Sequence, residues 1–382
     1  MKKLLALILA LICVLSLAAC GSSTANGGNV GKVDANGNKI DEGNAGSAPT
    51  VVEAADFIKA AKEANKHLTQ ANFFFVEDGT ILTLGGNSEK KYAGEYAKLT
   101  GVKMLIAGAG LDAYALTESG ELYCQANKIA DNVSIMQACT TNSNVESFCV
   151  INNNLVRIAS YTNLDKSYNE QFKNYPTGET AKGEIVFLEV DKHDFVALNS
   201  EGTFYAYWTS EAYNDLDFTG FEGLVVMDIA KHMDTMKNEL KSLTAAGIKA
   251  DGTVVATGTY ANDILSWGKL ADIAMADGLI VGLTADGKVK MTGDYAEKMK
   301  DIVEGWTNIT AIEAGYANGS FIDNIVSAID SNGIFHYACI MNEYNKPETG
   351  YVSVDGIEGK SGFKYTADGS EYYEKDNKWE KD

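Results

Sequence analysis

The chain has 382 residues, of which 52 are acidic and 32 are basic, so its formal net charge is -20 at pH 7. A surface this acidic repels phosphate backbones and anionic headgroups, which argues against a nucleic-acid partner and against membrane binding through charge. The six cysteines are too few and too scattered for a disulfide framework, whereas the length is ample for one large domain.

The first twenty residues have the three parts of an export signal. Lys2 and Lys3 precede an apolar run over residues 4–17, which is shorter than the roughly 20 residues that a membrane-spanning helix needs. Two alanines then lead to Cys20, and this ending resembles the bacterial lipobox, whose cysteine is diacylated. We therefore expect a signal peptide over 1–19 and a lipoprotein held on the outer face of the cell membrane by Cys20. The alternatives are an ordinary cleaved signal with an incidental cysteine, or an uncleaved anchor.

Residues 20–50 predict a flexible tether. Gly, Asn, Ser and Ala dominate this stretch and large apolar residues are almost absent, so it cannot bury enough surface to fold. Residues 34–41 faintly resemble a calcium loop, but the glycine comes one place early and no glutamate closes the loop. We interpret these residues as linker and expect no metal site.

Beyond residue 50 the chain repeats a hairpin pattern. Its clearest copies place Asp251-Gly252 and Asp286-Gly287 between short apolar runs, where the turn requires positive φ and glycine adopts it without a steric penalty. Further copies are predicted over residues 73–82, 113–122, 195–205 and 326–335, and over 148–156, where asparagines replace the glycine turn. Another short strand precedes most of the hairpins, at residues 102–108, 133–139, 185–190, 225–230, 270–276 and 309–315. A unit of three or four strands at intervals of roughly 33 to 50 residues indicates a β-propeller.

The stretch over residues 51–68 supports two interpretations. Its Ala and Lys content and apolar spacing favour an amphipathic helix. Aligning residues 54–79 with 308–333 instead places Asp56–Ala61 on a repeat strand. We predict a strand, because repeat position outranks propensity, which is a weak prior.

Two segments carry a resemblance to a known family. Val102 to Tyr123 and Gly305 to Gly315 resemble the repeats of the regulator of chromosome condensation family. The resemblance covers about residues 54–340 and implies an all-β fold, a seven-bladed β-propeller over 51–345. The remaining 346–382 would then supply a blade-closing strand at 351–356 and a small β tail. The sequence departs from the family in loop lengths and in a histidine that most copies lack.

Few parts of a catalytic site are present. The four histidines, at positions 67, 193, 232 and 336, show no metal-binding spacing, and the chain has neither a Gly-x-Ser-x-Gly motif nor a phosphate loop. His193 lies near Asp191 and Asp194 and is a candidate for a propeller mouth, with an ordinary loop histidine as the alternative. The Gly108-x-Gly110 pattern is explained by its place in the repeat rather than by a dinucleotide site. We expect no cofactor, no metal and no enzymatic activity.

The cysteines of the predicted propeller are expected to be small buried side chains in strands. They are Cys124, Cys139, Cys149 and Cys339. A disulfide between Cys139 and Cys149 across a hairpin is the alternative.

Two aromatic stretches are the candidate ligand-binding loops. Residues 160–183 form the longest insertion and residues 207–218 a second, acidic stretch; the candidates are Tyr161, Tyr168, Phe172, Tyr175, Tyr207, Trp208 and Tyr213. Aromatic anchors within a polar rim are typical of protein interfaces and of sugar-stacking sites. The alternative is that they pack onto the strands beneath. Residues 232–236 are predicted to form a loop that folds onto its own blade.

These features predict a non-enzymatic, surface-anchored binding module. Its loops would engage an extracellular protein or glycan, because loops rather than the fold itself carry function. The resemblance implies the same role, since exported bacterial members of that family look like binders, one kind inhibiting β-lactamase. Only the lipid would touch the membrane. One alternative is a propeller hydrolase or lyase acting on surface polysaccharide, and another is a structural component of an envelope complex.

Overall fold

Antiparallel sheets make up most of the part of the chain that the computed structural model describes. That part comprises residues 73–75, 81–83, 94–107, 113–138, 147–160, 163–167, 173–174, 178–191, 194–208, 211–234, 237, 239–315, 322–332, 334–341, 347–352, 363–365, 370–375 and 378–381. All of it belongs to one compact unit, residues 49–382. The signal peptide, the tether and the predicted strand Asp56–Ala61 lie outside the described residues and stay predictions.

The described strands form seven sheets. The first combines β1 (Phe73–Phe75), β2 (Ile81–Thr83), β25 (Phe363–Tyr365), β26 (Glu371–Lys375) and β27 (Lys378–Lys381). The next three are β3 (Val102–Ala107), β4 (Ala113–Thr117), β5 (Leu122–Cys124) and β6 (Asn127–Ala130); β7 (Val133–Ala138), β8 (Ser147–Ile151), β9 (Asn154–Ser160) and β10 (Asn163–Ser167); and β12 (Ile185–Asp191), β13 (Asp194–Asn199), β14 (Phe204–Tyr207) and β11 (Lys173–Asn174). The last three are β15 (Leu224–Asp234), β16 (Glu239–Lys249) and β17 (Val254–Gly258); β18 (Leu270–Ala276), β19 (Leu279–Thr284) and β20 (Val289–Thr292); and β21 (Ile309–Gly315), β22 (Ile322–Asp330), β23 (Phe335–Met341) and β24 (Pro347–Val352).

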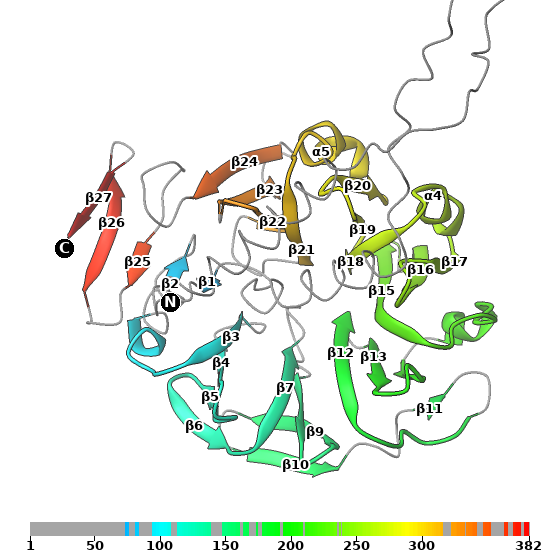
Figure 1. Ribbon diagram of the computed structural model, residues 1–382, viewed down its shortest axis with the longest axis horizontal. Coiled ribbons are helices and arrows are strands. Elements are labelled where there is room, and N and C mark those ends of the chain that lie inside the picture. Colours follow the sequence, from blue (N-terminus) through cyan, green and yellow to red (C-terminus); the bar gives the residue numbers. More distant parts are fainter. Residues whose placement is uncertain are drawn as a thin grey trace, which may run out of the picture. The chain divides into compact units, whose positions relative to one another are not determined.

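The sheets lie around a common centre, and one strand of each sheet is innermost (Figure 1). We call it the first strand of its sheet, although β11, an outer strand, precedes β12 in the chain. Contacts link these first strands in the chain order β1, β3, β7, β12, β15, β18 and β21. Six of the seven, β3 onward, shift register after their first pair, and the equivalent shifts show that the sheets repeat one unit. Radial repetition of small antiparallel sheets is the arrangement of a β-propeller.

All seven predicted hairpins are confirmed as antiparallel pairs of strands. Where the turns are described, the chemistry also agrees, since Gly252 and Gly287 have φ of 82° and 75°, and Asn152 and Asn153 have φ of 50° and 63°. These are left-handed conformations that glycine and asparagine tolerate best. The local sequence therefore determined the hairpins.

A hairpin turn is also tied to the sheet that follows it. The carbonyl of Gly202 accepts a hydrogen bond from the amide of Leu224, the first residue of β15, at 3.2 Å, and four sheet boundaries share this bond. A Cβ at Gly202 would lie 2.7 Å from the carbonyl oxygen of Leu224, so the glycine provides close approach as well as positive φ. The glycine of the repeat thus joins neighbouring sheets.

Apolar side chains fill the spaces between neighbouring sheets. Ile248, Ile273, Leu283 and Ile312, from β16, β18, β19 and β21, belong to one buried cluster and are each at most 3% exposed. Two of the sheets have three strands, and there the short helices α4 (Ala261–Ser266) and α5 (Ala296–Val303) follow and contact the third strand. A 3₁₀ helix, η1 (Glu211–Asp215), follows β14.

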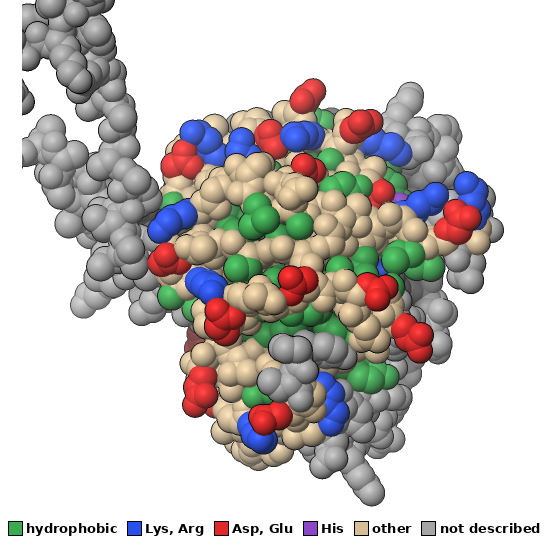
Figure 2. Space-filling model, turned by 90° about the vertical axis from the view of Figure 1, so that its right-hand side faces the viewer, with side chains coloured by type: hydrophobic (Ala, Val, Ile, Leu, Met, Phe, Trp, Pro, Cys, Tyr) green, Lys and Arg blue, Asp and Glu red, His purple; other side chains and the backbone are tan. Residues whose placement is uncertain are grey.

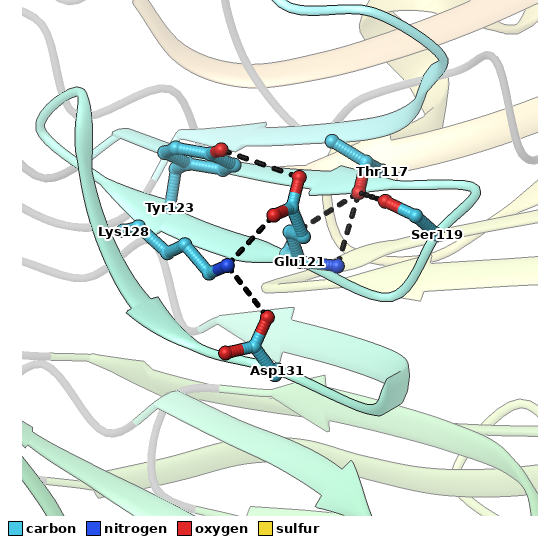
Figure 3. A network of polar contacts seen from close by, with 6 residues as sticks. All are labelled: Thr117, Ser119, Glu121, Tyr123, Lys128 and Asp131. Atoms are coloured by element: carbon cyan, nitrogen blue, oxygen red, sulfur yellow. Dashed lines mark hydrogen bonds and ion pairs between the residues drawn. The ribbon is translucent and has the colours of Figure 1, made fainter.

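Polar contacts tie the outer strand β6 to its sheet (Figure 3). Lys128 on β6 contacts the carboxylates of Glu121 at 2.7 Å and Asp131 at 2.6 Å. The hydroxyl of Thr117 accepts a hydrogen bond from the amide of Glu121 at 3.0 Å and closes the turn between β4 and β5. Hydrogen bonding to Lys128 lowers the pKa of the Glu121 carboxyl group. The charged side chains of this network are exposed to solvent, so we interpret their contacts as a link between the edge strand and its sheet rather than as a binding site.

Three sequence-based expectations need correction or narrowing. Residues 160–183 are not simply a loop, because they contribute β10 and β11 to two adjacent sheets. The strand predicted at 351–356 was expected to pair with the start of the chain, but β24 ends at Val352 and pairs with β23. The strand that pairs with β2, near the start, is β25. Residues 232–234 extend β15 as a strand instead of folding back as a loop. The expectation that the cysteines are buried in strands is confirmed for Cys124, Cys149 and Cys339, and Cys149 lies in β8 without a disulfide.

Candidate binding face

The hairpin β15–β16 projects beyond the neighbouring sheet at one end. Its strands have 11 residues each, against 6 or 7 in β18 and β19 of the next sheet. The extra length lies at the end where each first strand turns into the second, and we call that side of the sheets the loop face. The projecting part, residues 231–234 paired with 239–243, is called the ribbon.

On one side the ribbon is anchored to the preceding sheet. Lys231 forms an ion pair with Asp194 of β13, and both side chains are almost completely buried. The ammonium group of Lys231 also lies 5.7 Å from the centre of the Tyr213 ring. A buried ion pair of this kind holds its two elements in one arrangement, because separating the charges inside the protein is costly. Asp194, which the sequence placed beside His193 at a possible catalytic mouth, therefore anchors the ribbon.

On the other side the ribbon is anchored to the following sheet by a polar cluster. Nδ1 of His232 lies 3.0 Å from Oδ2 of Asp294, and Nε2 lies 3.3 Å from the hydroxyl of Tyr295. The contact between Nδ1 and Oδ2 is close but does not have the geometry of a hydrogen bond, and the tautomer of the ring decides which of Nε2 and the tyrosine hydroxyl is the donor. The hydroxyl of Ser242, opposite His232 in the ladder, donates to the same Oδ2 of Asp294.

Tyr260 belongs to the same cluster. Burial, and then the neighbouring Asp294 carboxylate, raise the pKa of Tyr260 to about 12. Its hydroxyl thus stays protonated at every physiological pH. Lys231 and His232, adjacent in sequence, point to opposite sides of the strand and join three neighbouring sheets at the loop face.

The predicted aromatic residues of the second stretch divide by burial. Tyr213 is fully buried, so its prediction as a ligand-contacting residue is wrong; its ring packs 4.8 Å from the indole of Trp208. Trp208 and Tyr207 are half-buried, with Phe218 stacked on Trp208 and Phe195 stacked on Tyr207. The stretch packs onto its sheet because Tyr213, Phe218 and Trp208 form one apolar cluster with Phe204 of β14. Of the candidate residues that the structure describes, Tyr207 and Trp208 keep surface at the loop face.

The other candidate ligand-binding residues lie outside the part of the chain that the structure describes. Tyr161, Tyr168, Phe172 and Tyr175 fall on residues that the structure does not describe, as does His193. The sequence did not single out Asp294, Tyr295 and Ser242, because they come from separate strands and have no motif spacing. The adjacency of Lys231 and His232 at the end of a repeat strand was the one available signal.

A second polar group lies near the centre of the sheets. Asp228 of β15 is 4% exposed and accepts hydrogen bonds from the amides of Ile229 at 2.6 Å and Met275 at 2.5 Å. Burial, and then repulsion by Glu189, raise the pKa of Asp228 well above its usual range. Asp228 therefore keeps its proton to a higher pH than an exposed aspartate does, and we interpret it as a structural carboxyl group.

Within the described residues, three or more His, Cys, Asp or Glu side chains never gather in a way that could hold a metal ion. The helices of that part are also too short or too polar to cross a membrane. On the side that carries α4 and β17, acidic and basic side chains are interspersed with small apolar areas (Figure 2). Charge on that side favours no ligand of a single sign.

Several solved structures are similar to this chain at low sequence identity. One of yeast RCC1 (Prp20) bound to Kap60 is 13% identical with a TM-score of 0.43, and the match covers 73% of this chain and 82% of that chain. One of Prp20p from Saccharomyces cerevisiae is 14% identical with a TM-score of 0.42, covering 75% and 87%. The CRINKLY WD40 ectodomain of the Arabidopsis thaliana receptor kinase ACR4 is 11% identical with a TM-score of 0.37, covering 68% and 91%.

Comparison by sequence gives no relative: no family model matches the chain and no curated protein matches it. We therefore infer function from the geometry of this chain.

Proposed function

We propose that this protein is a non-enzymatic binding module, held on the outer face of the cell membrane by a lipid on Cys20, that engages an extracellular protein or glycan through its loop face. We further propose that its sheets close into a seven-bladed propeller with repeats of the regulator of chromosome condensation type. A tether over residues 20–50 would let the propeller reorient near the membrane.

One observation carries the binding proposal, namely the side-chain anchors that join three neighbouring sheets at the loop face. Lys231 with Asp194, and His232 with Asp294, fix the root of the ribbon from both sides. A surface held in one conformation before binding loses little conformational entropy on binding. The half-exposed rings on this face, including Tyr207 and Tyr295, are side chains that interfaces favour.

Site-specific photo-crosslinking on intact cells tests the proposed face. A crosslinking amino acid replaces Tyr207 or Tyr295 in the full chain, and the matched control replaces Glu222, which lies at the opposite end of β15 and is 78% exposed. We expect discrete adducts from positions 207 and 295 and none from 222. Adducts that disappear with protease or with glycosidase identify a protein or a glycan, respectively. Equal labelling from all three positions, or from 222 alone, contradicts the proposal.

The anchor is tested separately. Cys20→Ser removes the acceptor for the lipid while the body of the protein is unchanged, so the protein should leave the membrane fraction or remain unprocessed. Retention of a processed form in the membrane fraction would contradict lipid anchoring.

The polar cluster supports a second candidate, a hydrolase or lyase acting on surface polysaccharide. An activated base or nucleophile commonly has a hydroxyl beside one histidine nitrogen and a carboxylate beside the other, and Tyr295, His232 and Asp294 lie in this order with contacts of 3.3 Å and 3.0 Å. If the site is catalytic, the wild-type protein releases oligosaccharides from extracted cell-surface polysaccharide and the Tyr295→Phe variant does not. Equal release by both, or none by the wild type, removes this candidate.

A further inference from the structure

Within the described part of the chain, the sheet of β15, β16 and β17 lacks a fourth strand. Four of the seven sheets continue beyond their third strand, with β6, β10, β11 and β24, whereas this sheet ends at β17. In the preceding sheet the fourth strand is β11, a segment of two residues that comes before β12 in the chain and pairs with β14. A short segment that is not continuous with the hairpin can therefore fill the fourth position.

The ladder between β16 and β17 determines which backbone groups of β17 point outward. At its turn end the amide of Lys249 donates to the carbonyl of Thr253 at 2.9 Å. Bonded and non-bonded pairs alternate along an antiparallel ladder, and the five pairs of this ladder follow one another without a register shift. The amide and carbonyl groups that face away from β16 are therefore those of Val254, Ala256 and Gly258.

The equivalent amide in the next sheet has a side-chain partner. Met291 on β20 follows Gly287 of its turn by four residues, as Ala256 follows Gly252. The amide of Met291 donates to Oε1 of Glu304, at the end of α5, at 3.0 Å. The helix α4 has six residues against eight in α5, and within the described residues it supplies no such acceptor to Ala256.

Other elements pack against the two faces of β17 but leave its edge partly open. On one face Val254 shares a buried cluster with Ile264 of α4, and on the other the hydroxyl of Thr257 accepts a hydrogen bond from the amide of Asp217 at 3.2 Å. Residues 255–257 nevertheless remain only half-buried. Among the described outer strands, β17 is the one without a charged residue, since β6, β10, β11, β20, β24 and β27 each have at least one. Charges commonly prevent pairing at a strand edge, and β17 has none.

We propose that the outer edge of β17 binds an extended, uncharged segment of a partner protein as the fourth strand of this sheet. In this mode of recognition backbone hydrogen bonds give the affinity, and side chains at alternate positions select the partner. The proposal rests on the edge of β17 and does not require the proposed function of the loop face.

The surroundings of the edge indicate the chemistry of this segment. β17 has Val254 on one face and Val255 on the other, so small or β-branched side chains of an added strand continue both faces. Acidic and basic side chains are interspersed on this side of the molecule, which gives a charged segment no advantage (Figure 2). A second copy of the chain is disfavoured, because each copy has a net charge of -20.

Binding of a labelled peptide to the full chain in detergent micelles tests the proposal. The probe is a capped peptide of alternating valine and threonine, and the matched control is the same peptide with two consecutive N-methyl groups at its centre. Successive amides of a strand point to opposite edges, so this change removes a donor from both edges of the peptide. We expect fluorescence anisotropy to show binding of the probe and at least about tenfold weaker binding of the control. Hydrogen exchange should slow over residues 254–258 when the probe binds. Equal binding of the two peptides, or protection only outside residues 254–258, would overturn the proposal.

Ala256→Pro tests the same edge from the side of the protein. Proline removes the outward amide, which takes no part in the ladder to β16, and strand edges tolerate proline where the amide faces solvent. We expect Ala256→Pro to weaken binding of the probe about tenfold, whereas the matched control Ala256→Ser keeps the amide and should bind as the wild type does. If Ala256→Pro does not fold, the methylated peptide and the exchange measurement still decide. A wild type that binds no probe, or one that dimerises through this edge so that Ala256→Pro abolishes the dimer, would refute the proposal.

Discussion

The buried ion pair between Lys231 and Asp194 is expected to be one of the most sensitive points of the fold. Lys231→Met keeps the length of the side chain but leaves the carboxylate of Asp194 buried without its cation. Asp194 is fully buried and Lys231 is 7% exposed, so water cannot replace the lost partner. Removing one member of such a pair costs about 3–5 kcal/mol. The lost contact of Lys231 with the Tyr213 ring adds to this loss.

The free energy of unfolding, measured by urea denaturation of the wild type and the variants, gives this cost. The double variant Lys231→Met/Asp194→Asn removes both charges and should recover much of the loss, because replacing a buried pair is far less costly than breaking it. Lys182→Met is the matched control, since Lys182 pairs with Glu179 at 3.4 Å and both side chains are about two-thirds exposed. That change should cost at most about 0.5 kcal/mol. If Lys231→Met cost no more than Lys182→Met, the ion pair would not anchor the ribbon.

Three further predictions concern the repeat turn, a buried acid and a buried thiol. Gly202→Ala should cost about 2–5 kcal/mol of unfolding free energy, because it adds both strain at positive φ and a clash with the backbone. Gly268→Ala is the control, since Gly268 has a similar φ but open space around it, and should cost only about 1–2 kcal/mol. Equal costs would show that the close approach of the backbone at Gly202 does not matter. The folded protein keeps the proton of Asp228 to a higher pH than the unfolded chain, which releases it above about pH 4. The unfolding free energy should therefore fall as pH rises from there through the raised pKa of Asp228. Glu189→Gln removes one cause of the raised pKa and should flatten this fall in a pH series of urea denaturations. Burial raises the pKa of the Cys149 thiol to about 12, so a thiol reagent should label it only after denaturation, as peptide mapping would report; labelling of the folded protein would contradict this.

Local sequence predicted the hairpins and most first strands correctly. Asp-Gly and Asn-Asn turns restrict the backbone to conformations that few residues adopt, and the flanking apolar runs have the length of strands. Both signals depend only on neighbouring residues. Their recurrence at intervals of roughly 33 to 50 residues then identified the repeat.

Sequence did not predict which strands complete each sheet. The outer strands β10 and β11 are polar and pair through their backbones, so their composition resembles that of a loop. The pairing of β25 with β2 joins residues 280 to 284 positions apart and has no local signal. Because this long-range pairing has no local signal, residues 351–356 were wrongly predicted to pair with the start of the chain in place of β25.

The candidate site divides in the same way. Sequence placed aromatic residues in the stretch 207–218, but the fold buried Tyr213 because its ring completes the apolar cluster with Trp208. No motif connects His232 with Asp294, which are 62 positions apart and meet across a sheet boundary.

Turn chemistry and alternation act over a few residues, so local sequence was enough to specify the repeating unit, a hairpin with a preceding strand. Tertiary structure alone decided which units touch, which aromatic rings are buried and where Lys231 and His232 point. Those outcomes depend on contacts between sheets, whose geometry arises only when distant strands pack together. The projecting ribbon combines both: its strands follow from local pattern, and its anchors from the two sheets on either side.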